Sequence, residues 1–246
     1  MKYKKKVTLI TGAGRGIGKA IAEKFAQENH DLVLLVRKKS EIKNLQLFEK
    51  KYHIKVKVYL GDLRKDKFIL KLKKEIRWVD NLVNNAAMAN TKFFLKVTNK
   101  DLNDLIKVNL ESIYKLSQIF AQKMIRNKIK GTIIGISSQL GHVGAYNRTL
   151  YCLTKFGLEG FTKSLALDLS KYGIRAITVA PTKTIVDDSE YKRTPARLKL
   201  IRNKIPLNKF STKEQIASIV YFATTDAASS ITGTSIVSDG GWTAGK

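Results

Sequence analysis

The chain has 246 residues, 43% of them hydrophobic, which is enough to bury a sizeable core, and no apolar run approaches the ~18–20 residues of a membrane span. Its single cysteine, Cys152, excludes an internal disulfide framework and suits a reducing compartment, while its three histidines show no ligand spacing, so we predict no metal site. The formal net charge of +26 leaves an acidic partner open, but the lysines are spread over the chain without any nucleic-acid-binding signature, so we expect no nucleic-acid partner.

Strand-like and helix-like segments alternate along the chain. The strand-like runs cover residues 7–11, 31–36, 54–60, 78–85, 131–138 and 174–180, and the helix-like stretches include residues 17–27, 68–76, 102–125 and 151–172. Because these strands are too apolar to be half exposed, the pattern predicts an α/β fold, a Rossmann-type doubly wound parallel sheet with helices on both faces. No repeat or linker divides residues 1–246, so we expect a single domain.

The first strand follows a basic segment and precedes a glycine-rich turn. The apolar part of this start is only residues 7–10, which favours a first strand in a cytoplasmic protein over a secretory signal. The turn, TGAGRGIG at residues 11–18, opens a helix. Gly12 permits a tight turn, Gly16 and Gly18 let the backbone approach a pyrophosphate, and the helix N-terminus offers free N–H donors. This strand–turn–helix setting predicts dinucleotide binding.

The end of the second strand indicates which dinucleotide is bound. It carries Arg37, Lys38 and Lys39 and no carboxylate. Sites for NAD usually place an acidic residue there to bind the ribose 2′-hydroxyl, whereas the 2′-phosphate of NADP favours an arginine. Arg15 could reach the same phosphate, and a guanidinium binds phosphate bidentately. We therefore predict NADP(H) over NAD(H), the alternative being that Arg37 only solvates the strand end.

Three residues between positions 138 and 155 supply acid–base chemistry. Tyr151 and Lys155 are four residues apart, so on a helix they share one face. A neighbouring ammonium lowers the pKa of a phenol, which would make Tyr151 a general acid or base near neutral pH. Ser138, just before this helix, could hydrogen-bond the same substrate oxygen. Alone, a Tyr and Lys at this spacing is more often a solvated surface pair.

These segments together resemble the short-chain dehydrogenase/reductase family over essentially the whole chain. Residues 11–18 resemble its cofactor loop, residues 84–87 its N-N-A-G motif with Ala87 in place of glycine, and residues 238–242 its C-terminal D-G-G segment. The family's catalytic set falls in this sequence on Asn109, Ser138, Tyr151 and Lys155.

The resemblance implies hydride transfer between a nicotinamide and a carbonyl or secondary alcohol. Tyr151 would exchange the proton with the substrate oxygen, Lys155 would lower the pKa of the phenol and hold the nicotinamide ribose, and Ser138 would position the substrate. Asn109 would hold a water in a proton relay, although in a helix it could equally be a satisfied polar residue. We expect the cofactor to contact Gly12, Arg15, Gly16, Ile17, Gly18, Arg37, Asp62, Leu63, Asn85, Ala86, Tyr151, Lys155, Pro181 and Thr184.

The segment after the sixth strand departs from the family pattern. Pro181 is kept, but Ile177 stands where the family often has asparagine and Thr182 where it has glycine. Because this segment normally orders the nicotinamide carboxamide, we hypothesise that Thr184 supplies a hydroxyl to it instead.

The substrate is expected to meet Ser138, Gln139, His142, Asn147 and Tyr151. Polar groups there suit a polyhydroxy or anionic small molecule, and residues 141–152 and 240–244 resemble sugar-type and polyol dehydrogenases of the family. We expect a lid around residues 183–210, with candidate contacts from Tyr191, Arg193 and Arg197.

Three alternatives accompany this prediction. The first is reduction of a 3-oxoacyl thioester on an acidic carrier protein, which the net charge of +26 would steer. The second is a catalytically silent dinucleotide sensor, and the third is a basic nucleic-acid-binding protein. The resemblance also suggests a homotetramer, built through helices around residues 102–126 and 151–172.

Overall fold

Seven parallel strands form the central sheet of the structure, a computed structural model that describes residues 5–185 and 195–245 apart from the Arg197 side chain. The strands are β1 (Val7–Thr11), β2 (Asp31–Val36), β3 (Val56–Leu60), β4 (Asn81–Asn84), β5 (Thr132–Ile136), β6 (Arg175–Pro181) and β9 (Thr234–Ser238), in the order β3-β2-β1-β4-β5-β6-β9. The direction of strand order reverses between β1 and β4. Ligands of such sheets bind at this reversal, outside the carboxyl ends of the strands.

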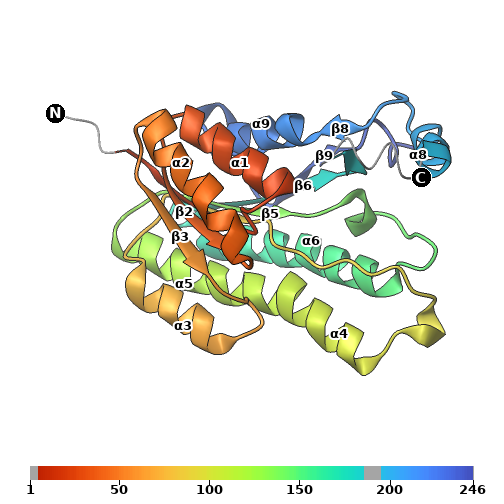
Figure 1. Cartoon of the computed structure of the whole chain (residues 1–246), viewed down its shortest axis with the longest axis horizontal. Coiled ribbons are helices and arrows are strands. Elements are labelled where there is room, and N and C mark those ends of the chain that lie inside the picture. The colour runs from red at the N-terminus through yellow and green to blue at the C-terminus, as the bar shows by residue number, and fades with distance from the viewer. Residues whose placement is uncertain (1–4, 186–194, 246) are drawn as a thin grey trace.

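Helices cover both faces of the sheet (Figure 1). One face carries α1 (Gly16–Gln27), α2 (Ile42–Tyr52) and α9 (Lys213–Thr224), and the other carries α3 (Asp66–Glu75), α4 (Asn99–Ile106), α5 (Ser112–Arg126) and α6 (Thr149–Ser170). Successive strand residues serve opposite faces, since Leu9 packs in the α3–α5–α6 core and Ile10 in the α1–α2–α9 core. The predicted α/β fold, with a doubly wound parallel sheet, is confirmed.

The six strands expected from the sequence are present, and their ends differ from the expected ones by at most three residues. The expected helix over residues 102–125 is two α-helices joined by a π-helix, η3 (Lys107–Glu111). The shorter helices are η1 (Lys39–Glu41), η2 (Phe94–Lys96), η4 (Gln139–Gly141) and η5 (Asp226–Ala228).

A small second core lies beside the carboxyl edge of the sheet. It is built from the two-stranded sheet of β7 (Thr184–Ile185) and β8 (Ser211–Thr212) and from α8 (Pro195–Arg202). Buried Leu198, Ile205 and Phe210 form its centre, and Trp242 packs against them. This core contains the described part of the predicted lid, whereas Tyr191, Arg193 and the side chain of Arg197 lie outside the described residues.

Within residues 5–185 and 195–245, the structure contains no helix with the length and apolar character needed to span a membrane.

Candidate active site

The glycine-rich turn between β1 and α1 packs against the end of β4. Gly12 and Gly16 have φ angles of 65° and 55°, which other residues rarely adopt. A Cβ atom on Gly18 would lie 2.2 Å from the carbonyl oxygen of Gly12 and 2.4 Å from Nδ2 of Asn85, so this glycine is required for close packing. α1 has no side-chain cap at Arg15 and no acidic residue in its first turn, which leaves its N–H donors available to an anion.

Asn85 holds this turn in place from the end of β4. Its Nδ2 donates to the carbonyl oxygens of Thr11 at 2.8 Å and Gly12 at 3.2 Å. The backbone N–H groups of Asn85 and Ala86 donate in turn to Oγ1 of Thr11, at 2.9 and 2.8 Å. Asn85 and Ala86, expected as cofactor contacts, thus also fix the turn that would hold the cofactor.

Asn109 lies in the π-helix η3 and is almost completely buried. Its Oδ1 accepts from the N–H of Met88 at 2.8 Å, and its Nδ2 donates to the carbonyl oxygen of Met88 at 2.8 Å and to Oγ1 of Thr154 at 3.1 Å. The side chain therefore ties the loop after β4 to α6. Asn109 thus has the hydrogen-bonded structural role that the sequence allowed as an alternative to a proton relay. Its side chain positions the loop beside Tyr151 and Lys155.

Ser138, Tyr151 and Lys155 meet between the end of β5 and the start of α6. The side chain of Lys155 is 1% exposed, and its Nζ donates to the carbonyl oxygen of Ile136 at 2.7 Å. The same Nζ lies 5.6 Å from the ring centroid of Tyr151, and the phenol of Tyr151 hydrogen-bonds with Ser138. Oγ of Ser138 also accepts from the N–H of Leu140 at 3.2 Å, which caps η4. The three side chains expected from the sequence are brought together.

Burial governs the protonation of this group. It raises the pKa of the Tyr151 phenol, against the opposing effects of the Ser138 hydrogen bond and the Arg148 charge. It lowers the pKa of the Lys155 ammonium to about 8, although the carboxylate of Glu159 raises it in part. Nζ of Lys155 donates to the carbonyl oxygen of Ile136 and is not among the groups that lower the pKa of Tyr151, so the effect of Lys155 on the phenol stays a prediction.

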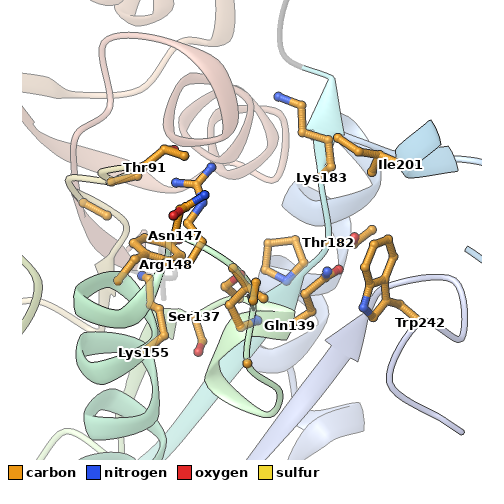
Figure 2. A pocket seen from close by; sticks show the side chains of 18 of the residues that line it. Thr91, Ser137, Gln139, Asn147, Arg148, Lys155, Thr182, Lys183, Ile201 and Trp242 are labelled. Carbon is orange, nitrogen blue, oxygen red and sulfur yellow. Dashed lines mark hydrogen bonds between the residues drawn. The ribbon is translucent and has the colours of Figure 1, made fainter. Parts of the chain in front are cut away.

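A cavity of about 1340 Å³ opens above these residues at the carboxyl ends of β4, β5 and β6. Figure 2 shows Lys155 entering it from α6, with Thr182 and Trp242 on the opposite side. The sequence-predicted residues in its lining are Ile17, Asn85, Ser138, Gln139, Asn147, Tyr151, Lys155, Pro181 and Thr184.

Two loops form the outer wall of this cavity and are bonded to each other. The N–H of Lys92 donates to the carbonyl oxygen of Asn147 at 3.1 Å, and Nη1 of Arg148 donates to that of Asn90 at 2.7 Å. Phe94, from the first loop, lines the cavity although 64% of it is exposed. The wall therefore combines polar backbone with exposed aromatic rings.

Three buried polar atoms of described residues in the cavity lining have no hydrogen-bond partner. They are Oγ of Ser137, Oε1 of Gln139 and Oγ1 of Thr182, all on buried residues. Such atoms are costly to leave unpaired, which makes them candidate ligand contacts. The hydroxyl of Thr184 instead donates to the carbonyl oxygen of Thr182 at 3.2 Å.

His142 is not among the residues that line the cavity. Its Nε2 lies 3.4 Å from Oε1 of Glu159 and 3.2 Å from Oγ of Ser235. Glu159 is buried and accepts a hydrogen bond of 2.7 Å from Oγ1 of Thr178. His142 therefore anchors the loop after η4 to Glu159 and Ser235. In the part of the chain that the structure describes, no group of three or more His, Cys, Asp or Glu side chains is placed to hold a metal ion.

The residues expected around the adenosine lie in the turn before α1 and at the ends of β2 and β3. Arg15 and Arg37 are exposed, and Leu63 is half-buried next to Asp62. The guanidinium of Arg64 donates to both carboxylate oxygens of Asp62, at 2.6 to 3.1 Å, and holds the pKa of Asp62 below its usual value. Arg64 was not predicted from the sequence, in which its position two residues after Asp62 was the available signal.

A family model described as enoyl-(acyl carrier protein) reductase matches residues 12–243 of the chain. The chain is 34% identical to the 3-oxoacyl-(acyl-carrier-protein) reductase FabG of Aquifex aeolicus over 98% of either protein. It is 32% identical to human L-xylulose reductase over 95% of either protein.

Solved structures share the whole architecture. A Beutenbergia cavernae protein assigned as an NAD(P)-dependent gluconate 5-dehydrogenase, with NADP bound at low occupancy, superposes with a TM-score of 0.89. The two chains are 27% identical, and the match covers 97% of each. The similarity therefore extends across the sheet, the helices on both faces and the carboxyl edge where the cavity lies.

Proposed function

This chain belongs to the short-chain dehydrogenase/reductase family, and we propose that it is an NADP(H)-dependent oxidoreductase acting on a small polar substrate of the sugar, polyol or keto-acid type. The reaction interconverts a carbonyl and a secondary alcohol. The observation that carries this proposal is the convergence of Ser138, Tyr151 and Lys155 on one cavity, beside the unpartnered buried Oε1 of Gln139.

Each residue of the site has a separate role at the substrate oxygen. Ser138 hydrogen-bonds this oxygen and fixes its position. Because burial raises the pKa of Tyr151, the phenol stays protonated at neutral pH and can donate its proton as the oxygen gains charge. In the oxidative direction the same phenol oxygen accepts the proton of the alcohol. Lys155 provides a positive charge in a buried environment, and Asn109 holds the loop opposite them.

The glycine-rich turn fits a dinucleotide, because the N-terminus of α1 has neither a side-chain cap nor an acidic residue in its first turn. When bound, the nicotinamide supplies or accepts the hydride. Exposed Arg15 and Arg37 are available to a 2′-phosphate, which supports NADP(H) over NAD(H).

Thr182 is the residue we propose for the nicotinamide carboxamide. Its buried hydroxyl has no partner, whereas the hydroxyl of Thr184, the candidate from the sequence, is bonded to the Thr182 carbonyl. Thr182, which stands where the family often has glycine, would thereby bind the carboxamide through its hydroxyl.

Gln139 and Asn147 favour a substrate with several hydroxyl or carboxylate groups. Both line the cavity near Tyr151, and a substrate hydroxyl would satisfy Oε1 of Gln139. The relatives active on sugars, such as the L-xylulose reductase, support the same substrate class.

The test is NADPH and NADH consumption, measured side by side on keto-sugars, keto-acids and a 3-oxoacyl thioester, with Tyr151→Phe as the control. We expect turnover of polar ketones with NADPH, which the variant loses. Turnover confined to the thioester would contradict the proposed substrate class, and faster turnover with NADH would contradict the proposed cofactor preference.

A second candidate is reduction of a 3-oxoacyl group on an acidic carrier protein. The 34% identity to the Aquifex aeolicus reductase favours it, as does the net charge of +26, which would steer an acidic partner. Exposed Phe93 and Phe94 at the cavity wall would suit the apolar part of such a substrate.

A further inference from the structure

A carboxylate folds back onto the glycine-rich turn. Glu41 ends η1, just beyond β2, and its side chain lies against the Cα of Gly14. A Cβ atom built on Gly14 would lie 2.2 Å from Cδ of Glu41 and 2.3 Å from its Oε2. The absence of a side chain at Gly14 therefore provides the space that the carboxylate fills. The sequence, with no acidic residue at the strand end itself, gave no indication of this contact.

The charge of Glu41 is not neutralised by a direct partner. Its Oε2 accepts one hydrogen bond, of 3.3 Å, from the backbone N–H of Lys38, and it forms no ion pair with any described residue. Asp62, the acidic residue expected at the adenosine, is held by Arg64. Glu41 is half-buried, and Gly14, against which its carboxylate packs, lies two residues before the start of α1, whose positive end attracts anions. A negative charge thus already occupies the anion-attracting side of the turn.

We infer that Glu41 is a determinant of cofactor selectivity that opposes Arg15 and Arg37, so that the site accepts NAD(H) as well as NADP(H). This inference rests on the proposed dinucleotide function. A carboxylate can accept a hydrogen bond from a ribose hydroxyl, whereas it repels a 2′-phosphate, which carries between one and two negative charges at neutral pH. The carboxylate of Glu41 therefore favours the binding of NAD(H) and weakens the binding of NADP(H).

The experiment measures dissociation constants of NADPH and NADH from their fluorescence on binding, without turnover, in the wild type and in Glu41→Gln. We expect the variant to bind NADPH about fivefold to tenfold more tightly, because a repulsion across a few ångströms of partly solvated space is removed. NADH should bind equally well or more weakly. Glu49→Gln, which removes the same charge from an exposed position further along α2, should leave the ratio of the two constants unchanged.

A second variant separates position from charge. Gly14→Ala keeps the carboxylate but displaces it, because the added Cβ would lie 2.2 Å from Cδ of Glu41. We expect the ratio of the NADH to the NADPH dissociation constant to rise, as in Glu41→Gln. A ratio that stays at the wild-type value in both variants would overturn the inference.

Arg37→Ala distinguishes this inference from the proposed function. If the alanine variant leaves the ratio unchanged while Glu41→Gln raises it, the arginine assignment fails and the role of Glu41 stands. If neither cofactor binds the wild type, the proposed function itself fails.

Discussion

Burial shifts the pKa values of Tyr151 and Lys155 in opposite directions, and for both groups it favours the neutral form. The phenol of Tyr151 becomes harder to deprotonate, and the ammonium of Lys155 becomes easier to deprotonate, with a pKa of about 8. The pair is thus prepared to donate a proton at neutral pH and loses its positive charge under mildly alkaline conditions.

Replacing Tyr151 with phenylalanine removes the proton donor while keeping the ring. We expect the turnover number to fall by about 10²–10⁴-fold, the usual contribution of a positioned general acid. Binding of NADPH, measured by fluorescence, should remain close to that of the wild type. Retained turnover would show that another group supplies the proton.

The pH dependence of reduction should report Lys155. Because its pKa is about 8 in the free protein, kcat/KM should be highest below pH 8 and fall as the pH rises through that value. The carboxylate of Glu159 raises this pKa, so Glu159→Gln should move the fall to lower pH. A profile with the same midpoint in both proteins would assign the alkaline limb to another group.

Thr182 and Thr184 can be compared by the same isosteric change. Thr182→Val removes a buried hydroxyl that has no partner, so we expect the free protein to gain about 1 kcal/mol in unfolding free energy. If the hydroxyl binds the carboxamide, NADPH affinity should fall about threefold to tenfold in the same variant. Thr184→Val should change that affinity less, and the opposite ranking would restore the candidate chosen from the sequence.

For single residues, the sequence predicted the site where the chemistry depends on spacing along one helix, as for Tyr151 and Lys155. It did not predict contacts between side chains that are far apart in the sequence. His142 was expected at the substrate but contacts Glu159, and Glu41 reaches Gly14 across the β2 end. These contacts are set by tertiary packing, for which sequence spacing contains no direct signal.

The junction between α1 and β2 illustrates how an element is fixed by a buried titratable group. Nδ1 of His30 lies 2.9 Å from Oγ1 of Thr8 in β1, and the ring packs edge-on against Phe25 of α1. Burial lowers the pKa of His30 to about 4 from its ordinary 6.5.

This shift predicts acid destabilisation with a definite sign. Below pH 6.5 His30 is protonated in the unfolded chain, whereas in the folded chain it stays neutral down to about pH 4. The free energy of unfolding therefore falls as the pH is lowered through this window. We expect unfolding free energy at pH 5 to be about 2 kcal/mol lower than at pH 7 from this group alone. Urea unfolding of the wild type and His30→Gln should show a smaller pH difference in the variant, and an equal difference would contradict the assignment.

At the element scale, the strands with continuous apolar residues were predicted and β9 was not. β9 reads TSIVS and is paired only on one side, so its residues remain partly exposed and its apolar signal is weak. The helices α2, α8 and α9 were also not predicted. The break between α4 and α5 could not be foreseen, because the apolar spacing of a π-helix segment differs from that of an α-helix by a single residue.

The strong positive charge belongs to the molecule as a whole. For an anionic substrate or an acidic carrier protein, we expect kcat/KM to fall as salt is raised from about 50 mM to 500 mM, since the attraction is screened over about 10 Å at 0.1 M. For a neutral keto-sugar, the same titration should change kcat/KM little. Equal salt dependence for both substrates would indicate an effect on the protein rather than steering.

Exposed apolar side chains on α5 and α6 support the proposed homotetramer. Tyr114, Leu153, Phe156 and Leu167 are between 48% and 77% exposed. A second copy of the chain would remove them from water. We expect analytical ultracentrifugation to give a tetramer and Phe156→Glu to give smaller species. A wild-type monomer would contradict the proposal.

For the molecule as a whole, the fold followed from the sequence because six predicted strands, five of them mostly buried, and a glycine turn leave few alternatives for a parallel sheet. The carboxyl ends of the strands then necessarily meet at one edge, which placed Ser138, Asn85 and the glycine turn near one another. The small core around Leu198, Ile205 and Phe210, which closes the cavity, was expected only as a lid.

The π-helix η3 also has a consequence for changes in chain length. A π-turn accommodates one residue more than an α-helix, and each residue of an α-helix advances the chain by about 100°. Deleting one residue among 107–111 would let α4 continue into α5 as one regular helix, but the side chains within the former π-turn would change direction by up to about that angle. Asn109 would then face away from Met88 and Thr154, even though no neighbouring side chain had been altered. A single lost codon in this helix would therefore disconnect the loop after β4 from α6.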